Sequence, residues 1–106
     1  MTPAGDDFIV GVLLAVWAGR FGPQAETLCE PLAEIAAART TLLSAAYLRA
    51  AARGECMQPW HALFHALCAS STDHLPRATR DLLSIGHTSG ADALAGFLAR
   101  DCLTHI

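Results

Sequence analysis

Glycine and proline interrupt this chain at short intervals, and the segments between them are rich in alanine and leucine. Alanine and leucine favour helices strongly, whereas glycine and proline tend to end them. The sequence has no run of alternating β-branched residues and no hairpin dipeptide such as Asn-Gly, so nothing in it indicates a β-strand. These features predict an all-α fold, a single compact bundle of about six short helices.

The helix-ending residues also predict where each helix lies. The first helix is expected over residues 6–18, because Gly19, Gly22 and Pro23 discourage its continuation. The others are expected over residues 24–38, 41–54, 59–70, 74–86 and 89–102. Helices are expected to start at Thr40 or Thr41, at Pro59 and at Asp73, and to stop at Gly54 and Gly86. Pro31 is expected to break the second helix or to start its second half. No connection is long enough to separate two domains, so residues 1–106 are expected to form one helical domain.

Charge and hydropathy narrow the classes of partner. Ten acidic residues and seven arginines, with no lysine, give a formal net charge of −3. Since the sequence has no basic patch to bind phosphates, we expect no nucleic-acid partner. The longest apolar run, residues 8–18, is about half of the roughly 20 residues that span a bilayer, and it lacks the basic start of a signal peptide. We therefore expect no membrane association and a cytoplasmic location.

The apolar content is high for a small domain, at 53% of the residues. The third predicted helix is apolar on nearly all sides, which is typical of a central helix in a bundle. Its apolar residues include Leu42, Leu43, Ala46, Leu48, Ala50 and Ala51. Several helices carry more apolar surface than six short elements would cover, so a partner, a second copy or an absent domain is expected to cover the rest.

Cysteine and histidine offer few metal ligands at useful spacing. The four cysteines are Cys29, Cys56, Cys68 and Cys102. They form no C-x-x-C pair and have apolar neighbours, which indicates reduced, buried thiols. His61, His65 and Cys68 are spaced for one helix face, but the glutamate of a zinc-protease motif is missing. We interpret these histidines as surface or core residues and predict no metal site.

The two ends of the chain share one pattern, in "TPAGDDFIVG" at residues 2–11 and "HTSGADALAG" at residues 87–96. Both phrases share one order of residues: a small residue, Gly, any residue, Asp, any residue, an aliphatic residue, any residue and a second Gly. Each phrase is expected at a helix N-terminus, where free backbone N–H groups and the helix dipole produce partial positive charge. The side chains expected to satisfy these ends are Asp6 and Asp7 in the first phrase and Thr88, Ser89 and Asp92 in the second.

Two interpretations of the repeated phrase remain open. The simpler one is two ordinary capped helices, in which Gly11 and Gly96 let another helix pack against the backbone. The other is a pseudo-symmetric pair that faces one polar site, where Gly5 and Gly90 adopt positive φ or approach a ligand closely. Such a site would hold a phosphate or carboxylate on its amides, and an amide, ammonium or metal on its aspartates.

A hydroxyl stripe is a third contributor to this hypothetical site. Thr40, Ser44 and Tyr47 are spaced to share one face of a helix. Either Ser44 bonds back to the carbonyl of residue 40 while Tyr47 reaches the surface, or Thr40, Thr41 and Ser44 complete the pocket. His87, inside the second phrase, could act as a general base, donate to an anion or cap the preceding helix.

Three segments, "TPAGDDFIVGVLLA", "RTTLLSAAYLRAAARGE" and "LLSIGHTSGADALAGFL", resemble in this order the C-terminal half of the AllH-like proteins. The resemblance implies a part in oxamate carbamoyltransferase, a multi-subunit enzyme that exchanges oxalurate and phosphate with oxamate and carbamoyl phosphate. In that family a Gly-rich stretch leads into a "TPSGDD" phrase, whereas here Ala4 stands in place of the serine. The resemblance also implies that an N-terminal portion is missing, as in a fragment, a split gene product or a stand-alone module.

These observations lead to one hypothesis about the site and one alternative. The expected catalytic residues are Asp6, Asp7, His87 and Asp92. The expected substrate-binding residues are Gly5, Thr40, Thr41, Ser44, Thr88, Ser89 and Gly90. The expected ligand is a small anionic substrate or phosphate, in a homo-oligomer or a complex with another subunit, and the sequence identifies no cofactor. The alternative is a non-catalytic assembly module that docks a larger subunit or self-associates.

Overall fold

A computed structural model describes residues 3–19, 24–69, 73–86 and 88–104, and these residues form helices with no strand. The helices are α1 (Ala4–Ala18), α2 (Ala25–Ala37), α3 (Leu42–Ala52), α4 (Gln58–Cys68), α5 (His74–Leu83) and α6 (Ser89–Thr104). The predicted all-α bundle is therefore confirmed. None of these helices is both long enough and apolar enough to cross a bilayer.

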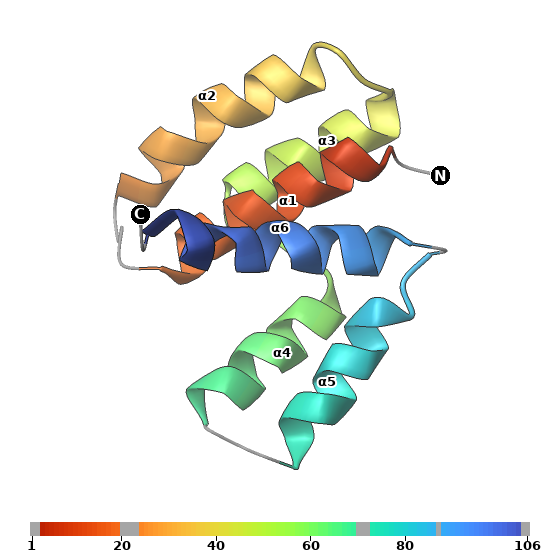
Figure 1. Cartoon of the computed structure of the whole chain (residues 1–106). Helices are drawn as coiled ribbons and strands as arrows, with labels where there is room; N and C mark the ends of the chain where they lie inside the picture. Colours follow the sequence, from red (N-terminus) through yellow and green to blue (C-terminus); the bar gives the residue numbers. More distant parts are fainter. Residues whose placement is uncertain (1–2, 20–23, 70–72, 87, 105–106) are drawn as a thin grey trace.

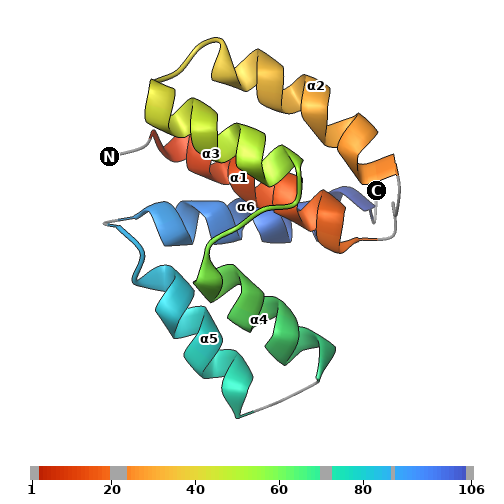
Figure 2. The ribbon, with the colours of Figure 1, turned by 180° about the vertical axis from the view of Figure 1, so that it is seen from behind.

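The first and last helices form the centre of the molecule. Figure 1 shows α1 and α6 crossing, with α2 and α3 on one side and α4 and α5 on the other. The segment between α3 and α4 passes over this central pair (Figure 2). The two ends of the sequence thus meet at the core, and the four other helices cover them as two pairs.

Leucine and aromatic side chains fill the core. Leu13 and Leu14 of α1, Leu48 of α3 and Leu82 of α5 are fully buried. Trp60, Phe64 and Phe97 stack with ring centroids 5.4–5.7 Å apart, so α4 packs on α6 through aromatic contacts. Burial of these side chains provides most of the driving force for folding.

Glycine makes the crossing of α1 and α6 possible. A Cβ atom on Gly11 would lie 1.7 Å from the Ala93 carbonyl oxygen, and one on Gly96 would lie 1.9 Å from the Phe8 carbonyl oxygen. Ala93 and Phe8 each stand three residues before the second glycine of their own phrase, so the contacts are related by a pseudo-twofold axis. The expectation that Gly11 and Gly96 lie at helix crossings is confirmed.

Most predicted helix ends also agree with the structure. Gly54 (φ 79°) and Gly86 (φ 58°) follow α3 and α5 in the left-handed conformation that glycine tolerates best. The Glu55 N–H donates to the Ala50 carbonyl at 2.9 Å, which closes the end of α3. Thr41 begins α3 and accepts from the Ser44 N–H at 3.2 Å.

Three local expectations were wrong. Pro31 lies inside α2 without breaking it. The Thr27 carbonyl loses its helical donor because proline has no N–H group, but both residues are exposed. The Asp73 side chain makes no capping hydrogen bond at the start of α5. α1 begins at Ala4, after Pro3, so Asp6 lies in its first turn instead of starting it.

The prediction that α3 is central was also wrong. Leu42 is 93% exposed and Leu43 52% exposed, because α3 packs only through one face, which includes Ala45 and Leu48. The expectation that all the cysteines are buried was wrong for Cys68, which is exposed at the end of α4. Cys29 is buried, and its thiol donates to the Leu13 carbonyl. Burial raises the pKa of the Cys29 thiol. The side chain of Cys102 lies outside the described residues.

Candidate functional site

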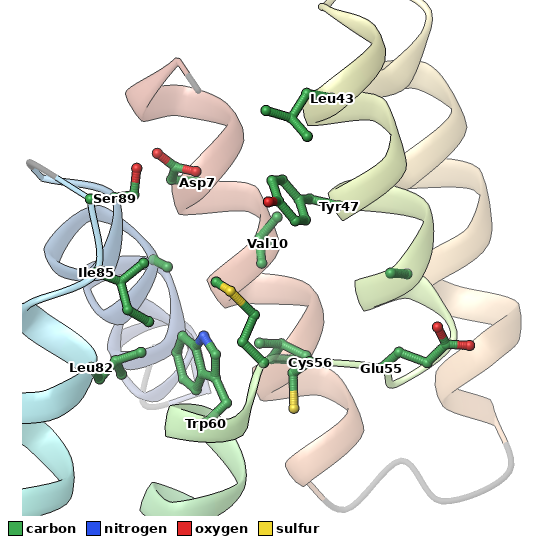
Figure 3. Close-up of a pocket in the computed structure, with 16 residues that line it drawn as sticks. Asp7, Val10, Leu43, Tyr47, Glu55, Cys56, Trp60, Leu82, Ile85 and Ser89 are labelled. Carbon is green, nitrogen blue, oxygen red and sulfur yellow. The ribbon is translucent and has the colours of Figure 1, made fainter. Parts of the chain in front are cut away.

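A cavity of about 460 Å³ opens between the two pairs of helices (Figure 3). Its walls come from α1, α3, α6, the start of α4, the end of α5 and the segments that precede α4 and α6. Most of the lining is aliphatic or aromatic, with few polar groups. This composition is typical of a site for a small organic ligand.

The cavity brings together one residue set from each repeated phrase. Asp7, on α1, and Ser89 and Gly90, on α6, all line it. Asp7 is only 9% exposed. In Figure 3 its carboxylate lies at one end of the cavity, between the Ser89 hydroxyl and the Tyr47 ring of α3. A carboxylate and two hydroxyl groups therefore lie at one place on a mostly apolar wall.

Asp6 and Thr40 contact each other and do not line this cavity. The Thr40 hydroxyl donates to the Asp6 carboxylate, which ties the segment before α3 to the first turn of α1. Thr41 is occupied as the N-cap of α3. Asp6 and Thr40 thus support the position of α1 relative to α3, and Asp6 is the neighbour of Asp7 in the chain.

The Ser44 side chain is buried, but its hydroxyl group bonds to nothing in the described part of the protein. It is 1% exposed, and its hydroxyl has no hydrogen-bond partner there. The expected bond from Ser44 to the carbonyl of residue 40 is therefore absent. A buried hydroxyl in this state costs about 1–3 kcal/mol, but Ser44 is not among the residues that line the cavity.

Asp92 lies in the first turn of α6 and Thr88 directly precedes this helix, and neither lines the cavity. The Asp92 N–H donates to the Thr88 carbonyl at 2.9 Å. One Asp92 carboxylate oxygen, Oδ2, is buried and has no hydrogen-bond partner among the residues described. His87, predicted as a catalytic residue, lies outside the described residues.

The two leading glycines of the phrases lack the positive φ that was one of their two expected roles. Neither Gly5 nor Gly90 has positive φ. A Cβ atom on Gly5 would meet nothing within 4 Å, whereas one on Gly90 would lie 1.9 Å from the Leu82 carbonyl oxygen. The Gly90 N–H also donates to the Ile85 carbonyl at 3.2 Å, so this amide is already engaged within the chain. Gly90 thus allows α6 to pack against the end of α5.

The charged groups that line the cavity are two carboxylates, Asp7 and Glu55. Glu55 pairs with Arg53 at 3.1 Å, and the hydrogen bond from Arg53 lowers the pKa of the Glu55 carboxyl group. Carboxylates accept hydrogen bonds from amide or ammonium N–H groups. The geometry therefore favours a ligand that presents N–H donors to the Asp7 end.

Several lining residues were not predicted from the sequence, among them Val10, Met57, Trp60 and Ile85. Val10 stands about one helical turn after Asp7 and shares its helix face, so helix periodicity could have predicted that Val10 lies beside Asp7. Met57 and Ile85 lie between helices, where no periodicity exists to read. The path of the chain over the central pair brings Met57 to the cavity.

Metal ligands do not gather elsewhere in the described ranges. No group of three or more His, Cys, Asp or Glu side chains is arranged there to hold a metal ion. The Cys56 sulfur lies 3.5 Å from His61 Nε2, while His65 and Cys68 are exposed on α4.

Comparison with known proteins assigns the family. Residues 1–100 match the family model described as oxamate carbamoyltransferase subunit AllH. No solved structure matches the chain. The matched range includes both repeated phrases, the residues that line the cavity and the α1–α6 crossing. The chain therefore belongs to the AllH family of oxamate carbamoyltransferase subunits.

Proposed function

We propose that the cavity binds the amide end of a small substrate during carbamoyl transfer between oxalurate and phosphate. In that reaction the bond from the carbamoyl carbon to the oxamate nitrogen breaks, and a bond from this carbon to a phosphate oxygen forms. The observation that carries the proposal is that Asp7 of α1 and Ser89 of α6 line the same cavity.

Each polar group of the cavity has a role in this proposal. The Asp7 carboxylate accepts a hydrogen bond from an N–H of the carbamoyl or oxamate group. The Ser89 hydroxyl donates to a carbonyl oxygen of the substrate, and Tyr47 supplies a second hydroxyl on the opposite wall. No side chain acts as a covalent nucleophile in this proposal, in which positioning and electrostatic stabilisation accelerate the transfer.

The anionic end of the substrate, a carboxylate or a phosphate, is assigned to the side of the cavity near the first turn of α6. The dipole of α6 favours negative charge there. Thr88 directly precedes this helix and is exposed. His87, Asp6 and Asp92 remain candidates for proton transfer or for support of this end.

A titration with oxamate tests the proposal. The ¹⁵N-labelled chain is titrated with oxamate, alone and after assembly with the other carbamoyltransferase subunits, and amide shifts are followed by NMR. We expect shifts in the first turns of α1 and α6, and at least tenfold weaker binding in Asp7→Asn. The matched control is Asp73→Asn, because Asp73 is exposed and does not line the cavity. Equal affinity in Asp7→Asn and wild type would contradict the proposal.

A second candidate function is a non-catalytic assembly module. Leu28, Leu32 and Ile35 recur along α2 and are exposed, which favours contact with another chain. Under this alternative, Asp7→Asn and Asp92→Asn affect only the ends of their helices and cost about 1 kcal/mol each. A protein that assembles normally but binds no oxamate in any state would favour this alternative.

A further inference from the structure

We propose that the ligand of the cavity is larger than oxamate: it is an amide whose nitrogen carries an apolar substituent, and this substituent lies against Val10, Trp60 and Ile85. The inference rests on the proposed function, from which it takes the place of the amide beside Asp7 and Ser89. It goes beyond that function because it names the class of ligand that fills the rest of the cavity.

The size of the cavity is the first argument. Its volume is about 460 Å³. Benzene, with six carbon atoms, is bound by an engineered protein cavity of about 150 Å³, and oxamate likewise has six non-hydrogen atoms. Oxamate alone would therefore fill roughly a third of the cavity, and a phosphate ion beside it would still leave a large part unfilled. Since small-molecule sites bury most of the surface of their ligands, a larger ligand fits this cavity better.

The polar and apolar groups of the cavity lie at different ends. Figure 3 shows the Asp7 carboxylate and the Ser89 hydroxyl together at one end, whereas Trp60 and Leu82 lie at the other. Oxamate is polar at both of its ends, an amide and a carboxylate, so it has no group that matches the apolar end. An amide with an apolar substituent matches both ends of the cavity.

The apolar end is preformed. Trp60 is only 4% exposed, and its ring packs against Phe64 and Phe97 with centroid distances of 5.7 and 5.4 Å. A side chain packed in this way cannot turn to fill the cavity itself. Val10 and Ile85 pack against the same core and are only partly buried, so they keep some apolar surface in contact with water. A substituent that covers this surface gains the hydrophobic contribution to binding.

The charges of the lining argue for a neutral substituent. Glu55 already pairs with Arg53 at 3.1 Å, so it needs no cation from the ligand. The described residues of the lining include no arginine, lysine or histidine, so an anionic substituent would be desolvated there without a partner. An aromatic or branched aliphatic substituent meets neither problem.

Titration with matched oxamates tests the inference. The ¹⁵N-labelled chain, alone and assembled with the other carbamoyltransferase subunits, is titrated with oxamate, N-isobutyloxamate and N-(3-hydroxypropyl)oxamate. The two substituents have equal numbers of non-hydrogen atoms and differ in polarity. We expect the isobutyl compound to bind at least tenfold more tightly than oxamate, because its substituent leaves water for the apolar end. The hydroxypropyl compound should bind at least threefold more weakly than the isobutyl compound.

Variants of the apolar end test where the substituent lies. Ile85→Ala, and Val10→Ala from another helix, should each reduce the ratio of isobutyloxamate to oxamate affinity at least threefold. The matched control is Leu98→Ala, because Leu98 is an exposed leucine of α6 that does not line the cavity, and it should leave the ratio unchanged. Circular dichroism verifies that each variant is folded.

The outcomes separate this inference from the proposed function. If N-isobutyloxamate binds no more tightly than oxamate, or if both apolar variants keep the full ratio, the inference is overturned and the proposed function stands. If Asp7→Asn binds all three compounds as wild type does while Ile85→Ala still reduces the ratio, the proposed function is rejected and the apolar end is retained. Absence of binding by all three compounds would overturn both.

Discussion

The two copies of the repeated phrase perform the same structural task and different tasks at the cavity. In both, the second glycine receives a carbonyl of the other helix, so α1 and α6 cross closely. At the cavity the copies differ, because the first contributes its aspartate, Asp7, and the second contributes Ser89 and Gly90. Ala4 stands in the first phrase where Ser89 stands in the second. The repeated phrase thus determines how α1 and α6 cross, whereas the residues packed around each copy decide which of its side chains line the cavity.

Replacement of the two glycines at the crossing, Gly11 and Gly96, should have the largest effect on stability, and the effect should be similar at both. Gly11→Ala and Gly96→Ala should each destabilise the protein by about 3 kcal/mol, because the new Cβ atom would overlap a backbone carbonyl and force the helices apart. Urea unfolding followed by circular dichroism measures both. A loss in one variant without a comparable loss in the other would break the pseudo-twofold comparison.

The leading glycines should instead respond with opposite signs. Gly90→Ala should cost about 2 kcal/mol, because its Cβ would overlap the Leu82 carbonyl oxygen. Gly5→Ala should stabilise the protein by about 0.5–1 kcal/mol, since alanine favours the helix and meets no neighbour. The same unfolding assay applies. Equal effects at both positions would show that the two phrases have equivalent surroundings.

The two aspartates offer a sharper test of the cavity. Asp7→Asn should weaken oxamate binding at least tenfold, while Asp92→Asn should change it less than twofold, because only Asp7 lines the cavity. Tenfold corresponds to about 1.4 kcal/mol of binding free energy. The NMR titration measures both variants. A large loss in Asp92→Asn would restore the symmetric two-aspartate site expected from the sequence.

The smallest expected effect concerns a bond that only the first phrase makes. Thr40→Val should destabilise the protein by about 1 kcal/mol, because Asp6 loses the hydroxyl that donates to it. Ala91 stands at the equivalent position of the second phrase and has no such side chain. Thr79→Val is the matched control: its hydroxyl bonds within α5, so the change should cost less than about 0.5 kcal/mol. Equal losses would mean that the Asp6–Thr40 bond adds nothing specific.

Local chemistry explains why the helices could be predicted and parts of the site could not. Gly54 and Gly86 end α3 and α5 through backbone bonds to residues a few positions away, and such short-range rules can be read from a sequence. The exposure of Leu42 and the burial of Ser44 follow from which face of α3 meets α1 and α2. The periodicity of α3 was too uniformly apolar to reveal that face.

The sequence by itself determined the all-α class, the approximate extent of the helices and the place of Gly11 and Gly96 at helix crossings. These depend on propensity, on helix-ending residues and on the repeated phrase, all of which act over short stretches of chain. Only the tertiary structure decided that Asp7 lines the cavity while Asp92 does not, and that Met57 and Leu43 line it too. Those positions depend on burial among residues distant in sequence, because packing energy arises from neighbours in space.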